Sequence, residues 1–333
     1  MSERIISYRA ALNEALVEEM ERDERVFLMG QDVAKFGGVF AVSKGLQDKF
    51  GPKRVFDTPI SETLIVGGGV GAALAGARPV VELQYADFAL VAMDEILNKA
   101  AKWRYMHGNR QSVPLVIRAA EGMFGGLGPE HSQSFGQYFW NAFGLKTLMP
   151  STPADAKSML KAAIRDDDPV LFLENKALYN RRGPVPDEVE VDPIGKASTI
   201  RNGTDLTIIA WSSMVAVALK AAEALAEEGI SAEVIDPRGV RPLDTATIFN
   251  SVDRTGRVLV THEGPVTGGL AGELIAQIVE TRFDKLLAPP ARVAGADTYV
   301  PQNLELERFI VPHLEHILAA ARKLAATGKS STQ

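Results

Sequence analysis

Hydrophobic and polar positions in the first half of the chain follow two different spacings. Apolar residues recur every three or four positions over 7–23, and short apolar runs such as Val26–Gly30 lie between such segments. The first spacing is typical of an amphipathic helix, and the second of a buried strand. We predict helices at 7–23, 41–51, 89–106 and 152–167, and strands at 26–30, 78–85, 113–120 and 169–175.

The same alternation restarts after residue 200. Predicted strands lie at 205–211, 231–237, 257–263 and 290–295, and predicted helices at 213–229, 244–252, 269–283 and up to 326. The stretch 179–197 interrupts the pattern, because it has three prolines and no helical spacing. Strands that alternate with helices favour parallel sheets covered on both faces. We therefore predict two α/β domains, each with a mostly parallel sheet flanked by helices: 1–185, a linker at 186–200, and 201–333.

Composition narrows the class of protein only moderately. The 333 residues are 46% hydrophobic and 23% charged, with a net charge of −6 and no cysteine. This charge gives no reason to expect nucleic acid or a membrane surface as partner, and disulfides and zinc–cysteine sites are excluded. The chain has neither a signal-peptide core nor an apolar run that could span a bilayer. We expect a cytoplasmic protein.

The stretch "TPISETLIVGGGVGAALAG" at 58–76 holds four glycines between residues 67 and 71. One interpretation is a dinucleotide loop, since Gly67, Gly69 and Ala72 loosely match G-x-G-x-x-G and Asp87 lies twenty residues beyond Gly67. However, a proline followed by serine and glutamate is typical of the start of a helix. The glycines would then lie inside that helix. They could serve only to let the helix pack closely, or the helix could also present Glu62 as a functional carboxyl group.

Several further stretches occur together with this one: "DTPISE", "VELQYADF", "GPEHSQS", "STPADAKSMLKAAIRDDDPVLFLE" and "VIDPRGVRPLD". In this order they resemble the β subunit of the thiamine-diphosphate-dependent 2-oxo acid dehydrogenases, the family of the pyruvate, branched-chain 2-oxo acid and acetoin enzymes. The resemblance covers residues 4–325. It implies a transketolase-like pyrimidine-binding domain, followed by a transketolase C-terminal-like domain that pairs subunits.

The resemblance implies a role for Glu62 in activating the cofactor. In this family a carboxyl group at the matching position bonds a nitrogen of the cofactor's pyrimidine ring and helps the cofactor to lose a proton. Ile60, Gln84 and Phe88 match the other residues of the pyrimidine pocket. Without the resemblance, Glu62 is an ordinary first-turn glutamate favoured by the helix dipole, and Phe88 a core residue.

His131 follows a loop rich in glycine and is one of five histidines. The resemblance implies that it lies near the thiazolium ring, where it binds the 2-oxo acid or assists acyl transfer to lipoamide. An imidazole suits either task, since it exchanges protons near neutral pH. Without the resemblance, a solvated surface histidine is the better interpretation.

The segment "AAIRDDDP" at 162–169 places three aspartates at the end of a predicted helix, where the dipole favours cations. The resemblance implies a potassium site here, with Leu115, Ala163 and Asp166 as ligands through their carbonyls and Asp168 nearby. Asp168 stands where relatives commonly carry asparagine. The identity of the cation is therefore left open.

The sequence contains no "GDG", the start of the family's magnesium–diphosphate motif. The resemblance therefore implies an α subunit that supplies the Mg²⁺ site, in an assembly of two α and two β chains, and a dihydrolipoyl acyltransferase that accepts the acyl group. Three alternatives stay open. The chain could be half of a split transketolase, a noncatalytic assembly chain of the same fold, or an NAD-binding oxidoreductase.

Overall fold

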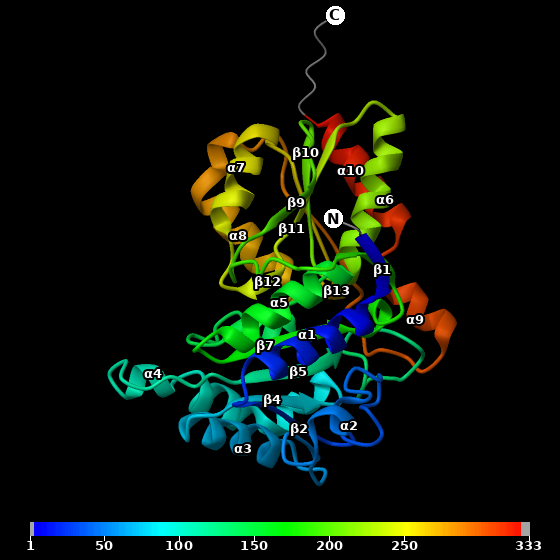
Figure 1. Ribbon diagram of the computed structural model, residues 1–333. Helices are drawn as coiled ribbons and strands as arrows, with labels where there is room; N and C mark the ends of the chain where they lie inside the picture. The colour runs from blue at the N-terminus through cyan, green and yellow to red at the C-terminus, as the bar shows by residue number, and fades with distance from the viewer. Residues whose placement is uncertain (1–2, 328–333) are drawn as a thin grey trace, which may run out of the picture. The chain divides into compact units, whose positions relative to one another are not determined.

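The structure is a computed structural model and describes residues 3–327. Its internal contacts divide the chain into two compact units (Figure 1). The first comprises residues 1–122 and 130–194, and the second comprises 123–129 and 195–333. The division therefore falls inside the predicted linker at 186–200, and the short segment 123–129 belongs to the second unit although it interrupts the first.

The first unit is built on a parallel sheet with the strand order β6-β7-β5-β4-β2-β3. These strands are β2 (Val26–Gly30), β3 (Val55–Asp57), β4 (Arg78–Leu83), β5 (Val116–Glu121), β6 (Lys146–Leu148) and β7 (Val170–Asn175). Strands β4, β5 and β7 are buried along their whole length. This burial explains their nearly continuous apolar sequence, which is typical of parallel strands covered on both faces.

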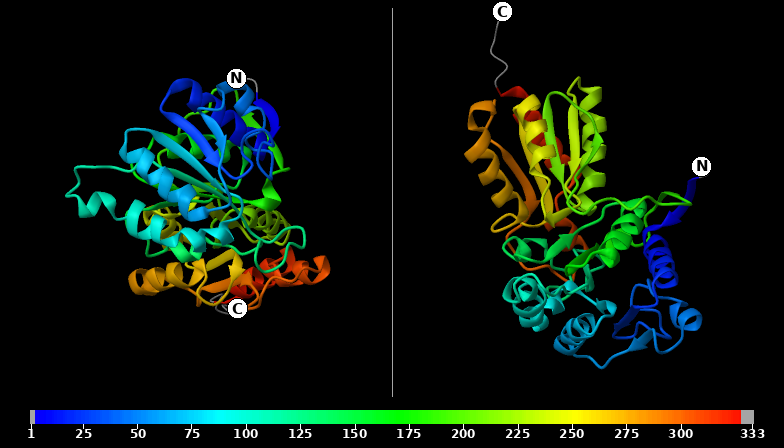
Figure 2. Two further views of the ribbon diagram at one scale, coloured as in Figure 1. Left: turned by 90° about the horizontal axis from the view of Figure 1, so that it is seen from below. Right: turned by 60° about the vertical axis from the view of Figure 1, so that its left-hand side comes forward.

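Helices α1 (Tyr8–Arg22) and α5 (Pro153–Arg165) pack together on one face of this sheet, and α3 (Glu62–Leu74) covers the other (Figures 1 and 2). Neighbouring residues of β4 show the two faces: Val80 joins the core beneath α1 and α5, whereas Val81 faces α3. Both α1 and α5 begin at a side-chain cap, as their sequences suggest, with Ser7 and Thr152 accepting backbone N–H bonds.

The predictions for two helices of the first unit are wrong: one helix is shorter than predicted, and the other is divided into segments. Only α2 (Leu46–Phe50) forms within 41–51, because Gly45 and Gly51 flank it at positive φ. The segment 89–106 contains a 3₁₀ helix (Ala86–Ala92), a π-helix (Asp94–Ala100) and the short α4 (Trp103–Met106) in place of one long helix. The remaining short 3₁₀ helices are Gly136–Phe139 and Lys176–Leu178.

A small sheet of the first unit joins segments that lie far apart in the sequence. β1 (Glu3–Ser7) pairs antiparallel with β8 (Arg182–Pro186), where we predicted no strand. Their pairing holds the beginning of the unit against its end.

The second unit contains a sheet with the order β14-β13-β10-β11-β9, parallel except for β9. Helices α6 and α10 cover one face and α7 and α8 the other (Figure 1). The strands are β9 (Ser198–Arg201), β10 (Leu206–Ala210), β11 (Ala232–Asp236), β13 (Val258–Pro265) and β14 (Ala291–Gly295), and β12 (Gly239–Arg241) follows β11. The helices are α6 (Ser213–Glu227), α7 (Thr245–Thr255), α8 (Leu270–Arg282), a 3₁₀ turn (Phe283–Lys285), α9 (Leu304–Ile310) and α10 (Leu314–Ala326). Both units thus have the predicted α/β architecture.

Among residues 3–327, no helix is both long enough and apolar enough to cross a membrane.

Candidate cofactor and catalytic site

The first unit's sheet has a switch point in its strand order between β2 and β4. The chain runs from β2 outward to β3 and then returns to β4 on the other side of β2. Ligands of parallel α/β sheets usually bind at the carboxyl ends of the strands beside such a point. Asp32, just after β2, and Gln84, just after β4, meet there, with Gln84 Nε2 donating to Asp32 Oδ2 at 3.3 Å. The predicted residue Gln84 therefore lies where this sheet type offers a binding site.

Helix α3 presents Glu62 as its first residue, after the extended Ser61. The Glu62 side chain is half-buried, and within residues 3–327 it has no hydrogen-bond or ion-pair partner. Ile60, two residues earlier, is 74% exposed. A partly desolvated carboxyl group that no protein group satisfies is available to a ligand.

The glycines of the stretch 58–76 between residues 67 and 71 lie inside α3 and form no phosphate loop. Gly69 lies against the sheet, where an added Cβ would stand 2.8 Å from Val81 Cγ1 and 2.9 Å from Leu115 Cδ1. The dinucleotide-loop interpretation is wrong, because that loop must precede its helix, whereas these glycines follow the first turn of α3. At Gly69 the missing side chain allows the helix to approach the sheet closely.

His131 lies in the loop after β5, in contact with two aromatic rings from the segment that follows β4. Its ring centroid lies 4.7 Å from that of Tyr85 and 5.3 Å from that of Phe88, both edge-on. Tyr85 and Phe88 also meet edge-on at 5.6 Å. The structure therefore brings the predicted residues His131 and Phe88 together at the carboxyl edge of the sheet.

Two members of this cluster were not predicted from the sequence. Tyr85 stands between the predicted residues Gln84 and Phe88 in "LQYADF", and Lys176 follows directly after β7. The ammonium group of Lys176 donates to the backbone carbonyl of His131 and lies 5.3 Å from the Tyr85 ring centroid. The position after a buried parallel strand could have drawn attention to Lys176, but its partner is far away in the sequence.

A buried ion-pair network connects the strands that carry the site. The Arg118 guanidinium on β5 is bidentate to Glu174 on β7, at 2.7 and 2.9 Å, and donates to Glu82 on β4 at 2.5 Å. Tyr179 donates to Glu174 at 2.8 Å. Burial raises the pKa of Glu82, while the charge of Arg118 opposes this rise. One arginine thus connects three neighbouring strands, including β4, which Gln84 directly follows.

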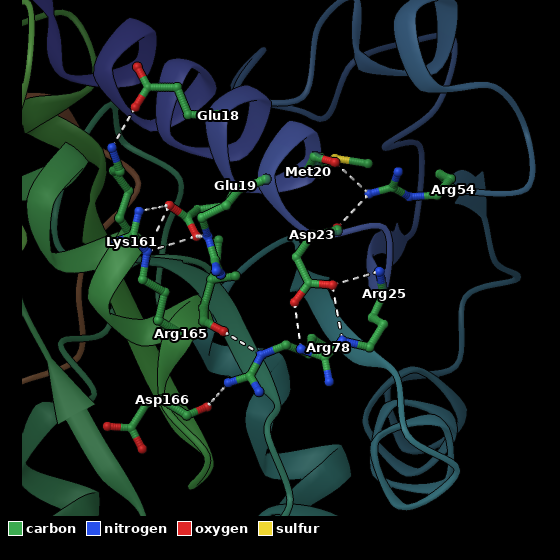
Figure 3. Close-up of polar contacts among 12 residues, drawn as sticks. Glu18, Glu19, Met20, Asp23, Arg25, Arg54, Arg78, Lys161, Arg165 and Asp166 are labelled. Atoms are coloured by element: carbon green, nitrogen blue, oxygen red, sulfur yellow. Dashed lines mark hydrogen bonds and ion pairs between the residues drawn. The ribbon is translucent and has the colours of Figure 1, made fainter.

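The residues expected to bind potassium have protein partners. The Leu115 carbonyl accepts from Val170 N at 2.8 Å, and the Asp166 carbonyl accepts from Arg78 (Figure 3). Lys146 binds both carboxylate oxygens of Asp166 at 2.6 Å.

The other two expected residues show the same pattern. Asp168 pairs with Arg104 at 2.5 Å, and the Ala163 carbonyl accepts from Asp166 N at 3.3 Å. In the described part of the chain, no group of acidic residues and histidines could hold a metal ion. These side-chain cations neutralise the aspartates, so no carboxylate among them is left for a potassium ion. The expected carbonyl ligands stay a prediction, and no step below depends on them.

A cavity of about 930 Å³ lies elsewhere in the first unit, beside α4. Leu97, Tyr105, Val113 and Phe143 are among its lining residues, and Asp168 is the one predicted site residue that it touches. Its apolar wall lacks the predicted groups Glu62, Gln84 and His131. These three predicted residues therefore lie outside this cavity.

Comparison with known families agrees with this architecture. Residues 4–182 match the transketolase pyrimidine-binding domain, and residues 195–317 match the transketolase C-terminal domain. The two matches cover both units and define a chain of the transketolase type.

Relatives narrow the class further. The chain is 46% identical to the pyruvate dehydrogenase E1 component subunit beta-1 of Arabidopsis thaliana, over 97% of this chain and 90% of the relative. It is also 46% identical to the 2-oxoisovalerate dehydrogenase subunit beta of Bacillus subtilis, over 96% of this chain and 99% of the relative. The chain belongs to the family of β subunits of the 2-oxo acid dehydrogenases, as its motifs predicted.

A solved structure has the same fold. It is described as a split gene transketolase, an inactive beta4 tetramer, and matches with a TM-score of 0.77 over 97% of this chain and 99% of that one. At 24% identity this likeness supports the fold alone.

Proposed function

We propose that this chain is the β subunit of a thiamine-diphosphate-dependent 2-oxo acid dehydrogenase. It would bind the aminopyrimidine half of the cofactor and act in the oxidative decarboxylation of a 2-oxo acid, with transfer of the acyl group to the lipoamide of a dihydrolipoyl acyltransferase. The observation that carries this proposal is the half-buried Glu62 carboxyl without a protein partner, at the edge of the sheet that also bears Gln84, Phe88 and His131.

The residues present fit a pyrimidine ring. An aromatic face, an amide and a free carboxyl group are the three kinds of contact that a flat, polar heterocycle needs. Phe88 and Ile60 would supply apolar contacts, and Gln84 a hydrogen bond. When bound, thiamine diphosphate supplies a carbon nucleophile that attacks the 2-oxo group and stabilises the resulting negative charge. Glu62 would share a proton with a ring nitrogen, and His131 would bind the substrate carboxylate or move a proton during acyl transfer.

The missing diphosphate motif supports a partner chain. Magnesium that holds a diphosphate needs one or two oxygen ligands from protein, and this sequence lacks the family's G-D-G. An α subunit would supply them, in an assembly of two α and two β chains paired through the second domain. The cytoplasmic location stays a prediction, since the plant relative is named mitochondrial.

The test combines this chain with an α subunit that carries G-D-G…N. Decarboxylation of pyruvate and of branched 2-oxo acids is measured with 2,6-dichlorophenolindophenol as electron acceptor, and lipoamide acylation with a dihydrolipoyl acyltransferase. We expect turnover only when both chains are present, and the substrate panel names the 2-oxo acid. Ketol transfer between sugars in place of decarboxylation would identify a split transketolase. Turnover by the isolated chain would contradict the shared site.

Glu62→Gln isolates the proposed proton exchange, because it keeps the size of the side chain and removes its acid. We expect a loss of activity on the order of 10²–10⁴-fold, the usual contribution of a general acid or base. The control is Glu95→Gln, another half-buried glutamate beside α3, whose side chain lies against Gly67. Equal activity of both variants would remove Glu62 from the mechanism.

A further inference from the structure

Lys176 is a buried cation in the first unit to which no role has been given so far. It is 2% exposed and begins the 3₁₀ turn directly after β7. The side chain of the preceding Asn175 accepts from Ala177 N at 3.0 Å, which fixes the start of that turn. Burying an ammonium group costs several kcal/mol unless polar partners compensate. The groups that Lys176 contacts therefore decide whether it has a role beyond stability.

The contacts of Lys176 lead to His131. Its ammonium group donates to the His131 backbone carbonyl, 45 residues away in the sequence. The same ammonium group lies 5.3 Å from the centroid of the Tyr85 ring, within the range of a cation–π contact. The Tyr85 ring in turn meets the His131 ring edge-on at 4.7 Å. Lys176 therefore contacts the backbone of His131 and also the ring against which its imidazole packs.

Lys176 holds the carbonyl of His131 itself, whereas Gln133, two residues further on, accepts from Gly122 N and donates to Asp87, both at 3.0 Å. Four glycines precede His131 between residues 122 and 128, and all four have positive φ. A glycine-rich loop leaves the direction of a side chain weakly defined, and active-site groups must be held to within about half an ångström. The end of β7 is held in the sheet, since the whole strand is buried and β5 pairs with it as far as Asn175.

We propose that Lys176 is a positioning residue for His131: its ammonium group fixes the loop backbone and, through Tyr85, the orientation of the imidazole. This inference rests on the proposed function and extends it, because it identifies the residue that holds His131, one of the two proposed reactive residues. Lys176 acts through His131 and exchanges no proton itself. Its removal should therefore disturb His131 first and turnover only as a consequence.

The first test needs neither cofactor nor partner. The full chain is labelled with ¹³C at the histidine ε1 carbons, and the His131 signal is assigned by its loss in His131→Asn. Lys176→Met should move or broaden this signal by more than a line width. The signals of His107, His262, His313 and His316 should stay in place.

Two control variants separate positioning from general destabilisation. Lys157→Met removes another buried lysine of the same unit, whose side chain is 1% exposed and pairs with Glu14 and Glu18 at 2.9 and 2.7 Å. It should lower stability and leave the His131 signal unchanged. Lys176→Arg, which keeps the charge, should largely restore the original signal. An unmoved His131 signal in Lys176→Met, or an equal shift in Lys157→Met, overturns the proposal.

A second pair of variants decides the matter if Lys176→Met fails to fold. Tyr85→Leu removes the ring between the ammonium group and the imidazole, whereas Tyr85→Phe keeps it. We expect the His131 signal to move in the first and to stay in the second. The opposite pattern, or no shift in either, contradicts the proposed contact.

Turnover of the complex with the α subunit gives the final readout. Lys176→Met should lower kcat about 10–100-fold, the cost of a misplaced catalytic group, with a smaller effect on cofactor affinity. In the His131→Asn background the same substitution should have no further effect, because the two residues act as a unit. Additive losses would overturn the proposal. If the wild-type complex shows no turnover, the proposed function fails, and the His131 signal still decides the role of Lys176.

Discussion

The close approach of α3 to its sheet can be tested with two alanine substitutions in one helix. Gly69 faces the sheet, and a Cβ there would lie 2.8 Å from Val81 Cγ1 and 2.9 Å from Leu115 Cδ1, closer than Cβ atoms approach their neighbours. Gly71 lies two positions further along the same helix, is exposed, and has no atom within 4 Å of the added Cβ. The two sites differ in packing while sharing the same helical backbone.

The magnitudes follow from two opposing effects. Replacing glycine by alanine inside a helix stabilises it by about 0.5–1 kcal/mol, and this gain is common to both sites. Forcing an extra methyl group into a packed core costs about 1–3 kcal/mol, and this cost falls on Gly69 alone, because Val81 and Leu115 are 0% and 1% exposed. Gly71→Ala should therefore stabilise the chain, Gly69→Ala should destabilise it, and the difference between them should be about 1–3 kcal/mol.

Urea unfolding of the two variants and the wild type measures this difference. Tryptophan fluorescence follows unfolding, with Trp103 and Trp140 in the first unit and Trp211 in the second. The midpoints are compared at equal slope, which shows that the surface exposed on unfolding has not changed. If Gly69→Ala and Gly71→Ala raise the midpoint equally, α3 does not pack closely at Gly69. The glycines would then need another explanation.

Three further predictions concern buried and paired charges. Arg118→Met should lower the free energy of unfolding by about 3–5 kcal/mol, because it leaves the buried carboxylates of Glu82 and Glu174 without their cation. The control is a substitution of the exposed Arg322, which should hardly change the urea midpoint. Burial, with a smaller contribution from Arg292, lowers the pKa of His262 to about 4, below its value of about 6.5 in an unfolded chain. Stability should therefore be complete above pH 6.5 and fall by up to about 3 kcal/mol as the pH drops towards 4, and urea titrations of His262→Gln should lack this slope. The melting temperature should be the same in equal concentrations of KCl and NaCl, since Arg104 and Lys146 already pair with the Asp168 carboxylate that was expected beside potassium. A potassium-specific rise would contradict this reasoning and support the expected carbonyl site.

Local patterns in the sequence determined much of the fold. The spacing of apolar residues located α1, α5 and α6, because each helix has one face that must be buried, and the apolar runs located β4, β5 and β7. The motif around Glu62, together with four others, identified the family, and it also indicated a helix with this residue in its first turn. These features depend on neighbours within a few positions, which a single sequence displays directly.

Other features were decided only by contacts between distant segments. The pairing of β1 with β8 joins Glu3 to Pro186, and neither stretch has a strong strand pattern of its own. The predicted helix 89–106 is divided into 3₁₀, π and α segments, although its apolar spacing suggests one continuous helix. Local propensity is a weak preference that packing against other elements overrides.

The candidate site also combines residues that sequence motifs identify with contacts that only the structure shows. Glu62, Gln84, Phe88 and His131 could be selected from motifs, but nothing in the sequence indicated that Lys176 contacts the carbonyl of His131. Side-chain contacts of this kind depend on strand order, which places the ends of β4, β5 and β7 beside one another. The sequence by itself thus determined which chemical groups are present and which elements carry them. Only the tertiary structure decided which of those groups meet, because that is set by how the strands assemble into a sheet.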